Sequence, residues 1–368
     1  MKGGNQVAVY LPMMVSSIFF LFLAHRLHLK RTTNSITFNM SKHNLARILL
    51  YSIAFVIPFL VAALRYQVGG DWHSYYGLFW WVNQGVNTHM EVGFEAIYRI
   101  TGFFTTNALY SFAIVSFLTL LPVYMTIKNY SVSPAISYFL FFTLGFYFQA
   151  FTSLRSYLAA AVCFWAFKHL KSGNMLFYVI CVLVASSFHI SAIIMLPVGF
   201  ILRIRMRASY YMIMFLFGVL ITIFHEPLFY ILTSFIWTAY REILYFHISY
   251  WNILLSSIVT LGCVVYYKKM IAKPSNIILI NSSIFSFLLY ATMSGWTGFA
   301  LSRIALYMNM FHILTIPEII NCEENKKVRI LYKACVALLF CAFCFILFYV
   351  HRTGDVAGTL PYRSIFSR

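Results

Sequence analysis

A short run of residues beginning at Arg65 combines charged side chains with glycines in a way that could bind an anion. It reads Arg65-Tyr-Gln-Val-Gly-Gly-Asp-Trp-His-Ser-Tyr-Tyr76 and follows an apolar segment. Gly69 and Gly70 permit a tight turn that would leave backbone amides exposed, a suitable cradle for phosphate or carboxylate. Asp71 follows as a candidate acid or base. The alternative interpretation of the run is a capped helix end followed by an interfacial aromatic belt.

Two glutamates follow at a spacing of four residues. Glu91 and Glu95, in Glu-Val-Gly-Phe-Glu, would share one face of a helix. One of them could act as a base, or both could hold sugar hydroxyls. Glu95 also precedes Arg99 by four residues, a spacing that favours a simple ion pair. The sequence leaves both roles open for Glu95 and makes Glu91 a candidate catalytic residue.

Three further polar positions interrupt apolar sequence. Arg155 begins an apolar helix in Thr-Ser-Leu-Arg-Ser-Tyr, and Arg303 begins another in Leu-Ser-Arg-Ile-Ala-Leu-Tyr, with Tyr307 one turn along the same face. His189 lies in Ser-Phe-His-Ile-Ser-Ala, inside a long apolar stretch. An imidazole can give and take protons near neutral pH. A lone histidine among apolar residues can equally be a structural hydrogen-bonding group, so both roles stay open for His189.

The chain around these residues has the composition of a membrane protein. Of 368 residues, 61% are hydrophobic and only 10% are charged, and the mean hydropathy is +0.80. Globular proteins carry roughly 25% charged residues. Apolar runs of about 20 residues recur along the length, each long enough to cross about 30 Å of hydrocarbon. The net charge of +18 is spread over short loops between these runs, which argues against nucleic-acid binding.

Basic clusters indicate which loops face the cytoplasm. The stretch 25–47 contains five Lys and Arg residues and no acid, so we expect it inside and the N-terminus outside. The first apolar stretch has no signal-peptide cleavage site and is expected to be a retained helix. Alternation of sides then predicts helices at 7–24, 46–64, 107–127, 134–151, 155–170, 174–188, 190–203, 210–226, 251–268, 276–293, 300–320 and 330–350.

The segments between these helices complete the expected architecture. Two long outer loops, 65–106 and 227–250, are rich in aromatic residues and could hold short interfacial helices. The tail 351–368 also falls outside. The expected fold is an all-α polytopic membrane protein with about twelve transmembrane or re-entrant helices, a single transmembrane domain over 1–368.

The stretch 175–202 is too long for one helix, yet basic residues flank both of its ends. Two short helices that meet near His189 resolve this conflict. Irregular backbone within a membrane survives only where protein or a water-filled cavity surrounds it. We therefore expect His189 at the break of a helical hairpin.

In the predicted topology, lysines and arginines are divided unequally between the inner and outer sides of the membrane. Apart from Lys2, every lysine falls inside, whereas the other outer basic residues are arginines. A guanidinium holds phosphate or carboxylate by two parallel hydrogen bonds. Arg65, Arg155 and Arg303 begin or end apolar helices, where a charge is costly and usually functional. Any one of them could simply extend to the membrane surface, but the three together favour a phosphate site.

The sequence lacks the motifs of several classes of enzyme. There is no Walker A loop, GxGxxG, HExxH or GxSxG. Of the seven cysteines, only Cys341 and Cys344 have CxxC spacing, and they lie in an apolar segment without a second such pair, so neither a disulfide framework nor a zinc site is indicated. No inner loop is long enough for a domain that binds nucleotide sugars. A substrate would therefore arrive already activated and membrane-bound, and no metal or other cofactor is expected.

The run from Arg65 to Tyr76 resembles the signature of the EpsG family of Wzy-like polysaccharide polymerases, which is approximately R-Y-x-x-G-T-D-Y-x-x-Y. Gly70 stands where that signature usually has Thr, and Trp72 where it has Tyr. The likeness continues, in the family's order, through Glu91-Val-Gly-Phe-Glu95, Arg155, Phe188-His189-Ile-Ser-Ala, Ser302-Arg303 to Tyr307, and Pro361-Tyr362-Arg363.

This resemblance implies a GT-C-like glycosyltransferase of a bacterial inner membrane with its active site facing the periplasm. Such an enzyme takes a growing glycan from undecaprenyl pyrophosphate and joins it to the non-reducing sugar of a lipid-linked repeat unit of O-antigen, capsule or exopolysaccharide. Its expected partners are the undecaprenyl-pyrophosphate-linked oligosaccharide and the lipid bilayer. A chain-length regulator is left open as a further partner.

The candidate residues divide into two roles under this interpretation. Cationic and aromatic side chains and the glycine turn would bind pyrophosphate or glycan: Arg65, Arg155, Arg303, Tyr76, Tyr307, Gly69 and Gly70. The arginines would offset the charge that develops on the leaving group. Asp71 or Glu91 would orient or activate the acceptor hydroxyl, and His189 would act as base or phosphate ligand.

Two other functions use similar substrates. An O-antigen ligase shares the lipid-linked donor but passes the glycan to lipid A-core, and the residues alone barely separate it from a polymerase. A flippase or transporter of lipid-linked sugars would place charges near the membrane midplane and contain internal repeats. We find no repeat, and the charges cluster towards one face, so the resemblance favours the polymerase.

Overall fold

The computed structural model describes residues 9–33, 40–224, 227, 250–293, 298–345 and 358–366. Within these ranges the chain is helical apart from turns and short connections and forms no strand, which confirms the all-α prediction. The elements are α1 (Tyr10–Thr33), α2 (Met40–Ala63), α3 (Trp72–Asn83), α4 (Val92–Phe104), α5 (Leu109–Tyr130), α6 (Pro134–Thr143), α7 (Phe146–Gln149), α8 (Leu154–Trp165), α9 (Phe167–Ser172), α10 (Met175–Phe188), the 3₁₀ helix η1 (Ile190–Ile194), α11 (Met195–Leu202), α12 (Ala208–Ile223), α14 (Tyr250–Val265), α15 (Tyr267–Met270), α16 (Asn276–Met293), α17 (Gly298–Asn309), α18 (His312–Cys322) and α19 (Lys326–Phe345).

Several of these helices have the character of membrane segments. Three contain stretches long and apolar enough to cross a bilayer: Tyr10–Leu27, Asn44–Ala63 and Leu109–Tyr130. Shorter apolar helices accompany them within the described ranges. A helix satisfies its backbone hydrogen bonds internally, as a segment surrounded by lipid requires. These helices and the composition mark the chain as a membrane protein.

Some predicted helices are divided in two. The predicted helix 134–151 forms α6 and α7, because Gly145 between them adopts a left-handed backbone with φ of +84°. The predicted helix 300–320 likewise forms α17 and α18. Hydropathy did not indicate these breaks, since the residues on both sides are apolar.

The predicted break at His189 is confirmed. His189 has extended backbone, with φ −156° and ψ 117°, between α10 and η1. α11 then returns along α10, where the Tyr178 hydroxyl donates to the Met195 carbonyl at 2.6 Å. A Cβ on Gly199 would lie 2.2 Å from the same hydroxyl oxygen, so the two helices are closely packed. His189 is therefore near the turn of a helical hairpin.

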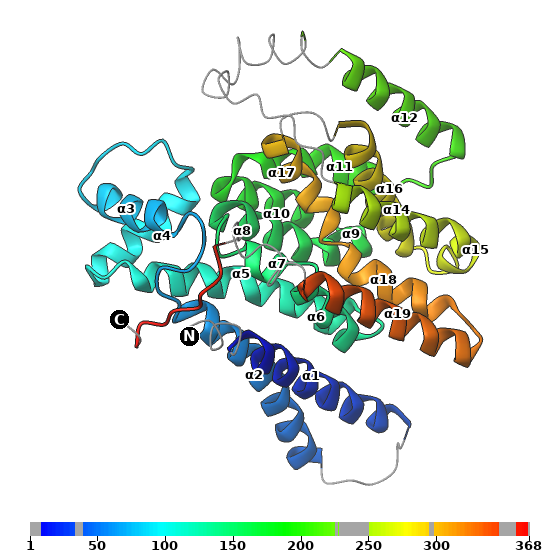
Figure 1. The fold of residues 1–368 in the computed structure, drawn as a ribbon, viewed down its shortest axis with the longest axis horizontal. Coiled ribbons are helices and arrows are strands. Elements are labelled where there is room, and N and C mark those ends of the chain that lie inside the picture. Colours follow the sequence, from blue (N-terminus) through cyan, green and yellow to red (C-terminus); the bar gives the residue numbers. More distant parts are fainter. Residues whose placement is uncertain are drawn as a thin grey trace.

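The predicted outer loop 65–106 contains two helices, α3 and α4, which pack together through aromatic rings. The rings of Phe79 on α3 and Tyr98 on α4, for example, lie 5.7 Å apart edge to face. Figure 1 shows the pair as a lobe at one end of the molecule, while α1 and α2 extend from another side. The second predicted loop, 227–250, lies outside the described residues apart from its two ends.

The C-terminal segment 358–366 crosses the turn that follows α2. The amide of Tyr66 donates to the carbonyl of Arg363 at 2.8 Å, and the amide of Gly69 donates to the carbonyl of Gly358 at 2.7 Å. The prediction that the tail 351–368 falls on the outer side did not include this packing. The segment connects the end of the chain to the turn that carries the Gly-Gly-Asp run.

Candidate active site

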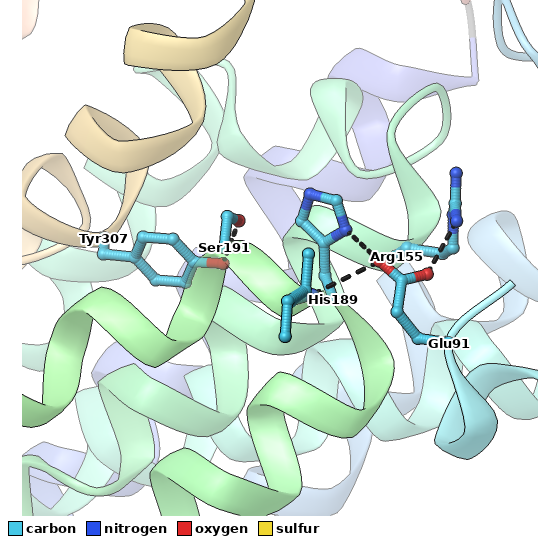
Figure 2. A network of polar contacts seen from close by, with 6 residues as sticks. Glu91, Arg155, His189, Ser191 and Tyr307 are labelled. Atoms are coloured by element: carbon cyan, nitrogen blue, oxygen red, sulfur yellow. Dashed lines mark hydrogen bonds and ion pairs between the residues drawn. The ribbon is translucent and has the colours of Figure 1, made fainter. Parts of the chain in front are cut away.

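The carboxylate of Glu91 joins two segments that are distant in sequence. Its Oε2 accepts a hydrogen bond from Nη1 of Arg155 at 2.6 Å, and its Oε1 lies 2.7 Å from Nδ1 of His189. The backbone amide of Ile190 also donates to Oε1, at 3.3 Å. Figure 2 shows Arg155 and His189 converging on this carboxylate from different elements.

Three helix ends position this cluster. Glu91 directly precedes α4, Arg155 is the second residue of α8, and His189 follows the last residue of α10. Gly93 allows the close approach, because a Cβ there would lie 2.3 Å from Oγ and 2.8 Å from the carbonyl oxygen of Ser187. Only a residue without a side chain lets the first turn of α4 pack directly on the end of α10.

The ionisation of Glu91 determines the state of its neighbours. Burial alone would raise the pKa of Glu91, but the hydrogen bond with His189 and the charge of Arg155 outweigh it and lower the pKa to about 2. An ionised carboxylate only accepts hydrogen bonds, so Nδ1 of His189 must carry the proton. In the neutral imidazole, the lone pair is then on Nε2.

Nε2 of His189 is buried and has no hydrogen-bond partner among the described residues. The whole side chain is only 7% exposed. A buried polar atom without a partner is costly and marks a candidate functional group. A histidine oriented by a carboxylate at Nδ1, with its Nε2 lone pair available, is arranged to act as a general base.

Arg155 supplies positive charge beside this base. Its side chain is 29% exposed, and its Nε is buried without a partner in the described part of the chain. The guanidinium also lies close enough to the Tyr75 side chain to interact with it electrostatically. Donors therefore remain on Arg155 after the ion pair with Glu91 is made. The arrangement suits removal of a proton from a hydroxyl next to a developing negative charge.

A second polar contact lies on the other side of His189. The hydroxyls of Ser191 and Tyr307 are 2.9 Å apart and join η1 to α17, as Figure 2 shows. Tyr307 is only 2% exposed, so in this conformation it positions η1 rather than meeting a substrate. Arg303 is one turn earlier on α17, but its side chain lies outside the described residues.

Arg65 is sealed in the interior. Its guanidinium is 1% exposed, donates to the Ala62 carbonyl and to Oγ of Ser116 (2.8 Å), and lies over the ring of Phe151. Nε and Nη2 have no partner among the described residues. In this conformation Arg65 fixes the turn after α2, and contact with pyrophosphate would require the turn and the C-terminal segment 358–366 to move.

The glycine turn also differs from the expected anion cradle. The amide of Gly69 donates to the Gly358 carbonyl, and that of Gly70 donates to Oγ1 of Thr152 at 3.0 Å. Both amides are thus engaged by the protein. Gly69 has φ of +114°, and a Cβ there would lie 2.3 Å from the Phe151 carbonyl oxygen, so the glycine serves close packing.

The remaining predicted site residues lie on α3 and α4. Asp71 is exposed at the N-terminal end of α3. Tyr76 stacks on Trp72, with ring centroids 4.9 Å apart. Of the two roles left open for Glu95, the ion pair with Arg99 is present, with Nη2 and Oε1 2.6 Å apart.

Two residues that position the cluster were not predicted as site residues. Gly93 and Ser191 were visible only as part of Glu-Val-Gly-Phe-Glu and His-Ile-Ser, and their roles depend on packing between distant helices. Among the described residues, no three His, Cys, Asp or Glu side chains gather in a way that could hold a metal ion.

Comparison with known proteins gives one match. No curated protein and no solved structure matches the chain significantly. A family model matches residues 48–364, which include α3, α4, the helical hairpin around His189 and the C-terminal segment. With a match over most of its length, this chain belongs to the EpsG family, which includes Wzy-type polymerases.

Proposed function

We propose that this protein is a polysaccharide polymerase of the Wzy type. It would transfer a growing glycan from undecaprenyl pyrophosphate to the non-reducing end of a lipid-linked repeat unit of O-antigen, capsule or exopolysaccharide. The family match supports the class of reaction. The observation that carries the proposal is the orientation of His189 by Glu91, which leaves a buried Nε2 without a partner among the described residues, while Arg155 pairs with the other oxygen of the same carboxylate.

The reaction begins at the acceptor sugar. Nε2 of His189 is buried in this conformation, so the surrounding helices must move apart to admit the acceptor. Nε2 then takes the proton of an acceptor hydroxyl, and the oxygen attacks the anomeric carbon at the reducing end of the growing glycan. The bond from that carbon to the pyrophosphate oxygen breaks, and undecaprenyl pyrophosphate leaves with the electron pair. Glu91 stabilises the imidazolium that forms, and the proton is later released to water.

The leaving group gains negative charge as this bond breaks. Arg155 still has donors available for a phosphate oxygen, and Arg303 is placed on α17 one turn from Tyr307, whose hydroxyl reaches the segment after His189. These two arginines would supply the electrostatic stabilisation in this proposal, which needs no metal or other cofactor. Asp71, Tyr76 and the aromatic surface of α3 would orient the acceptor glycan.

The proposal also includes the membrane topology of the chain, the side on which the site lies and the partners. The chain would form a single transmembrane domain over 1–368, with about twelve transmembrane or re-entrant helices in a GT-C-like arrangement. The cluster at Glu91 would face the periplasm of a bacterial inner membrane. Its partners would be the undecaprenyl-pyrophosphate-linked oligosaccharide, the bilayer and a chain-length regulator.

The test is the surface polysaccharide of a deletion strain, separated on a gel beside the parent strain. For an O-antigen, we expect core that carries at most one repeat, with the ladder restored by the wild-type gene but not by His189→Ala. An unchanged ladder would contradict the proposal. Loss of even the single repeat would indicate a flippase or an O-antigen ligase, and the latter would also accumulate lipid-linked polymer.

A further inference from the structure

The exposed side of α4 has an apolar edge and a charged edge. Val92, Ile100, Phe103 and Phe104 are 80%, 60%, 84% and 79% exposed. Positions 92, 100 and 103 share one face of the helix, because they are separated by eight and three residues. The ion pair of Glu95 with Arg99 lies along the neighbouring edge. Clustered aromatic and aliphatic side chains at this exposure mark a binding surface.

This apolar edge adjoins a helix that can span a membrane. Only four residues connect Phe104, the last residue of α4, to the start of α5. α5 exposes Tyr110, Ile114 and Phe117 by 59%, 39% and 39%. These positions are spaced by four and three residues, so they form one exposed apolar stripe on a helix long and apolar enough to cross a bilayer. Lipid would cover this stripe if α5 spans the membrane.

We propose that α4 is an interfacial helix, with Val92, Ile100, Phe103 and Phe104 seated in the lipid beside α5. Glu95 and Arg99 would face the water and the lipid headgroups. An amphipathic helix with large apolar side chains on one edge lies in the plane of a membrane surface, with that edge about 5–10 Å deep. Continuity with the exposed apolar stripe of α5 favours lipid over a second protein as the occupant.

The position of α4 sets the depth of the candidate site. Glu91 directly precedes Val92, so the apolar edge begins next to the residue that orients His189. The edge extends about 17 Å along the helix from position 92 to position 103. A helix held in this way keeps Glu91 at the level of the headgroups. If the proposed function is correct, that is where the pyrophosphate of a lipid-linked substrate lies.

Photocrosslinking to lipid tests the contact without measuring polymerase activity. The full chain would carry p-benzoylphenylalanine in place of Phe103, Arg99 or Ile114, and would be reconstituted in vesicles of phosphatidylethanolamine and phosphatidylglycerol. Position 114 reports the exposed apolar stripe of α5, and position 99 is the matched exposed control on α4. After illumination, mass spectrometry of the modified peptide identifies what each position contacts.

We expect lipid adducts at position 103 with a yield similar to that at position 114 and above that at position 99, which is only four residues away and borders the apolar edge. Absence of lipid adducts at 103, with adducts present at 114, would overturn the proposal. Adducts at 103 with another copy of the chain would also overturn it and would identify a protein interface. Because the readout is lipid contact, failure here is distinct from failure of the polymerase assignment.

Discussion

Among the residues of the site, Glu91 contacts both Arg155 and His189. The pKa of Glu91 decides which side chain of the site can take a proton. With a pKa of about 2, its carboxylate is a weak base at neutral pH. Its contacts with Arg155 and His189 use both of its oxygens. Glu91 is therefore suited to orienting His189 and holding its proton on Nδ1, which leaves proton removal to Nε2.

Glu91→Gln tests this division of roles. The amide keeps the shape of the side chain but removes the charge that fixes Nδ1–H and pairs with Arg155. We expect polymerisation of purified lipid-linked repeat units to slow by roughly 10²–10⁴-fold, as when the orienting carboxylate of a catalytic histidine is neutralised. Glu95→Gln, which disrupts an exposed ion pair on the same helix, is the control and should retain nearly full activity. Equal losses in both variants would contradict an orienting role for Glu91.

The same pKa sets the acid range in which Glu91 stabilises the fold. Its pKa falls from 4.5 in the free group to about 2 in the folded chain, so the unfolded chain binds the proton more tightly. The stabilising contribution is complete above about pH 5 and is lost as pH falls through 4.5 towards 2. We expect the stability difference between wild type and Glu91→Gln, at most about 3 kcal/mol, to shrink from pH 5 to pH 3. A difference that stays constant over this range would disprove the depressed pKa.

Arg155→Lys tests whether the geometry of the guanidinium matters in addition to its charge. An ammonium lacks the planar fork of a guanidinium, so it cannot present two parallel N–H donors to a phosphate while it is held by Glu91. We expect loss of long-chain polymer in cells, with a rate in vitro that falls on the order of 10²-fold. Arg99→Lys keeps the same charge at an exposed position and should give normal chains. Normal chain lengths with Arg155→Lys would exclude bidentate recognition of pyrophosphate by this residue.

At the scale of elements, the contact between α4 and α10 is what brings Glu91 to His189. Gly93→Ala should separate these elements, because the added methyl group would overlap the backbone and side chain of Ser187. We expect a loss of activity of at least about tenfold and a loss of stability of roughly 1–3 kcal/mol. Gly77→Ala in α3 is the matched control, since its Cβ would meet nothing within 4 Å. Activity and thermal unfolding of the two variants in detergent provide the comparison, and similar results for both would contradict the packing argument.

Local sequence rules predicted the elements better than their contacts. The break at His189 followed from the length of an apolar stretch and the basic residues at its ends, and the Glu95–Arg99 pair followed from spacing alone. By contrast, Glu91 meets partners 64 and 98 residues further along the chain. No spacing rule reaches that far, so the sequence identified these candidates without indicating which of them meet.

The burial of Arg65 could not be predicted from local sequence either. An arginine at the end of an apolar helix is expected to extend towards the membrane surface. In the folded chain the turn it begins is covered by the segment 358–366, nearly three hundred residues later. Its burial is decided by that tertiary contact. The sequence therefore assigned it to the phosphate site, whereas the structure gives it a packing role in this conformation.

At the scale of the whole molecule, the site combines residues that are spread from position 91 to position 307. Its residues come from the ends of α4, α8 and α10, and Tyr307 on α17 reaches the segment after His189. These ends must lie on the same side of the membrane for the cluster to form. The proposed reaction requires that side to be the outer one, because polymerisation would take place in the periplasm.

Cysteine accessibility tests this orientation. Gln84, after α3, and Asn325, before α19, are both exposed. Asn325 is followed by Lys326, Lys327 and Arg329, a cluster that favours the cytoplasmic side. In spheroplasts treated with a charged, membrane-impermeant maleimide, we expect labelling of Gln84→Cys above the parent chain, whereas Asn325→Cys should be labelled only after permeabilisation. The reverse pattern would place the Glu91 cluster inside the cell, where a periplasmic polymerase could not work, while leaving the geometry of the cluster unchanged.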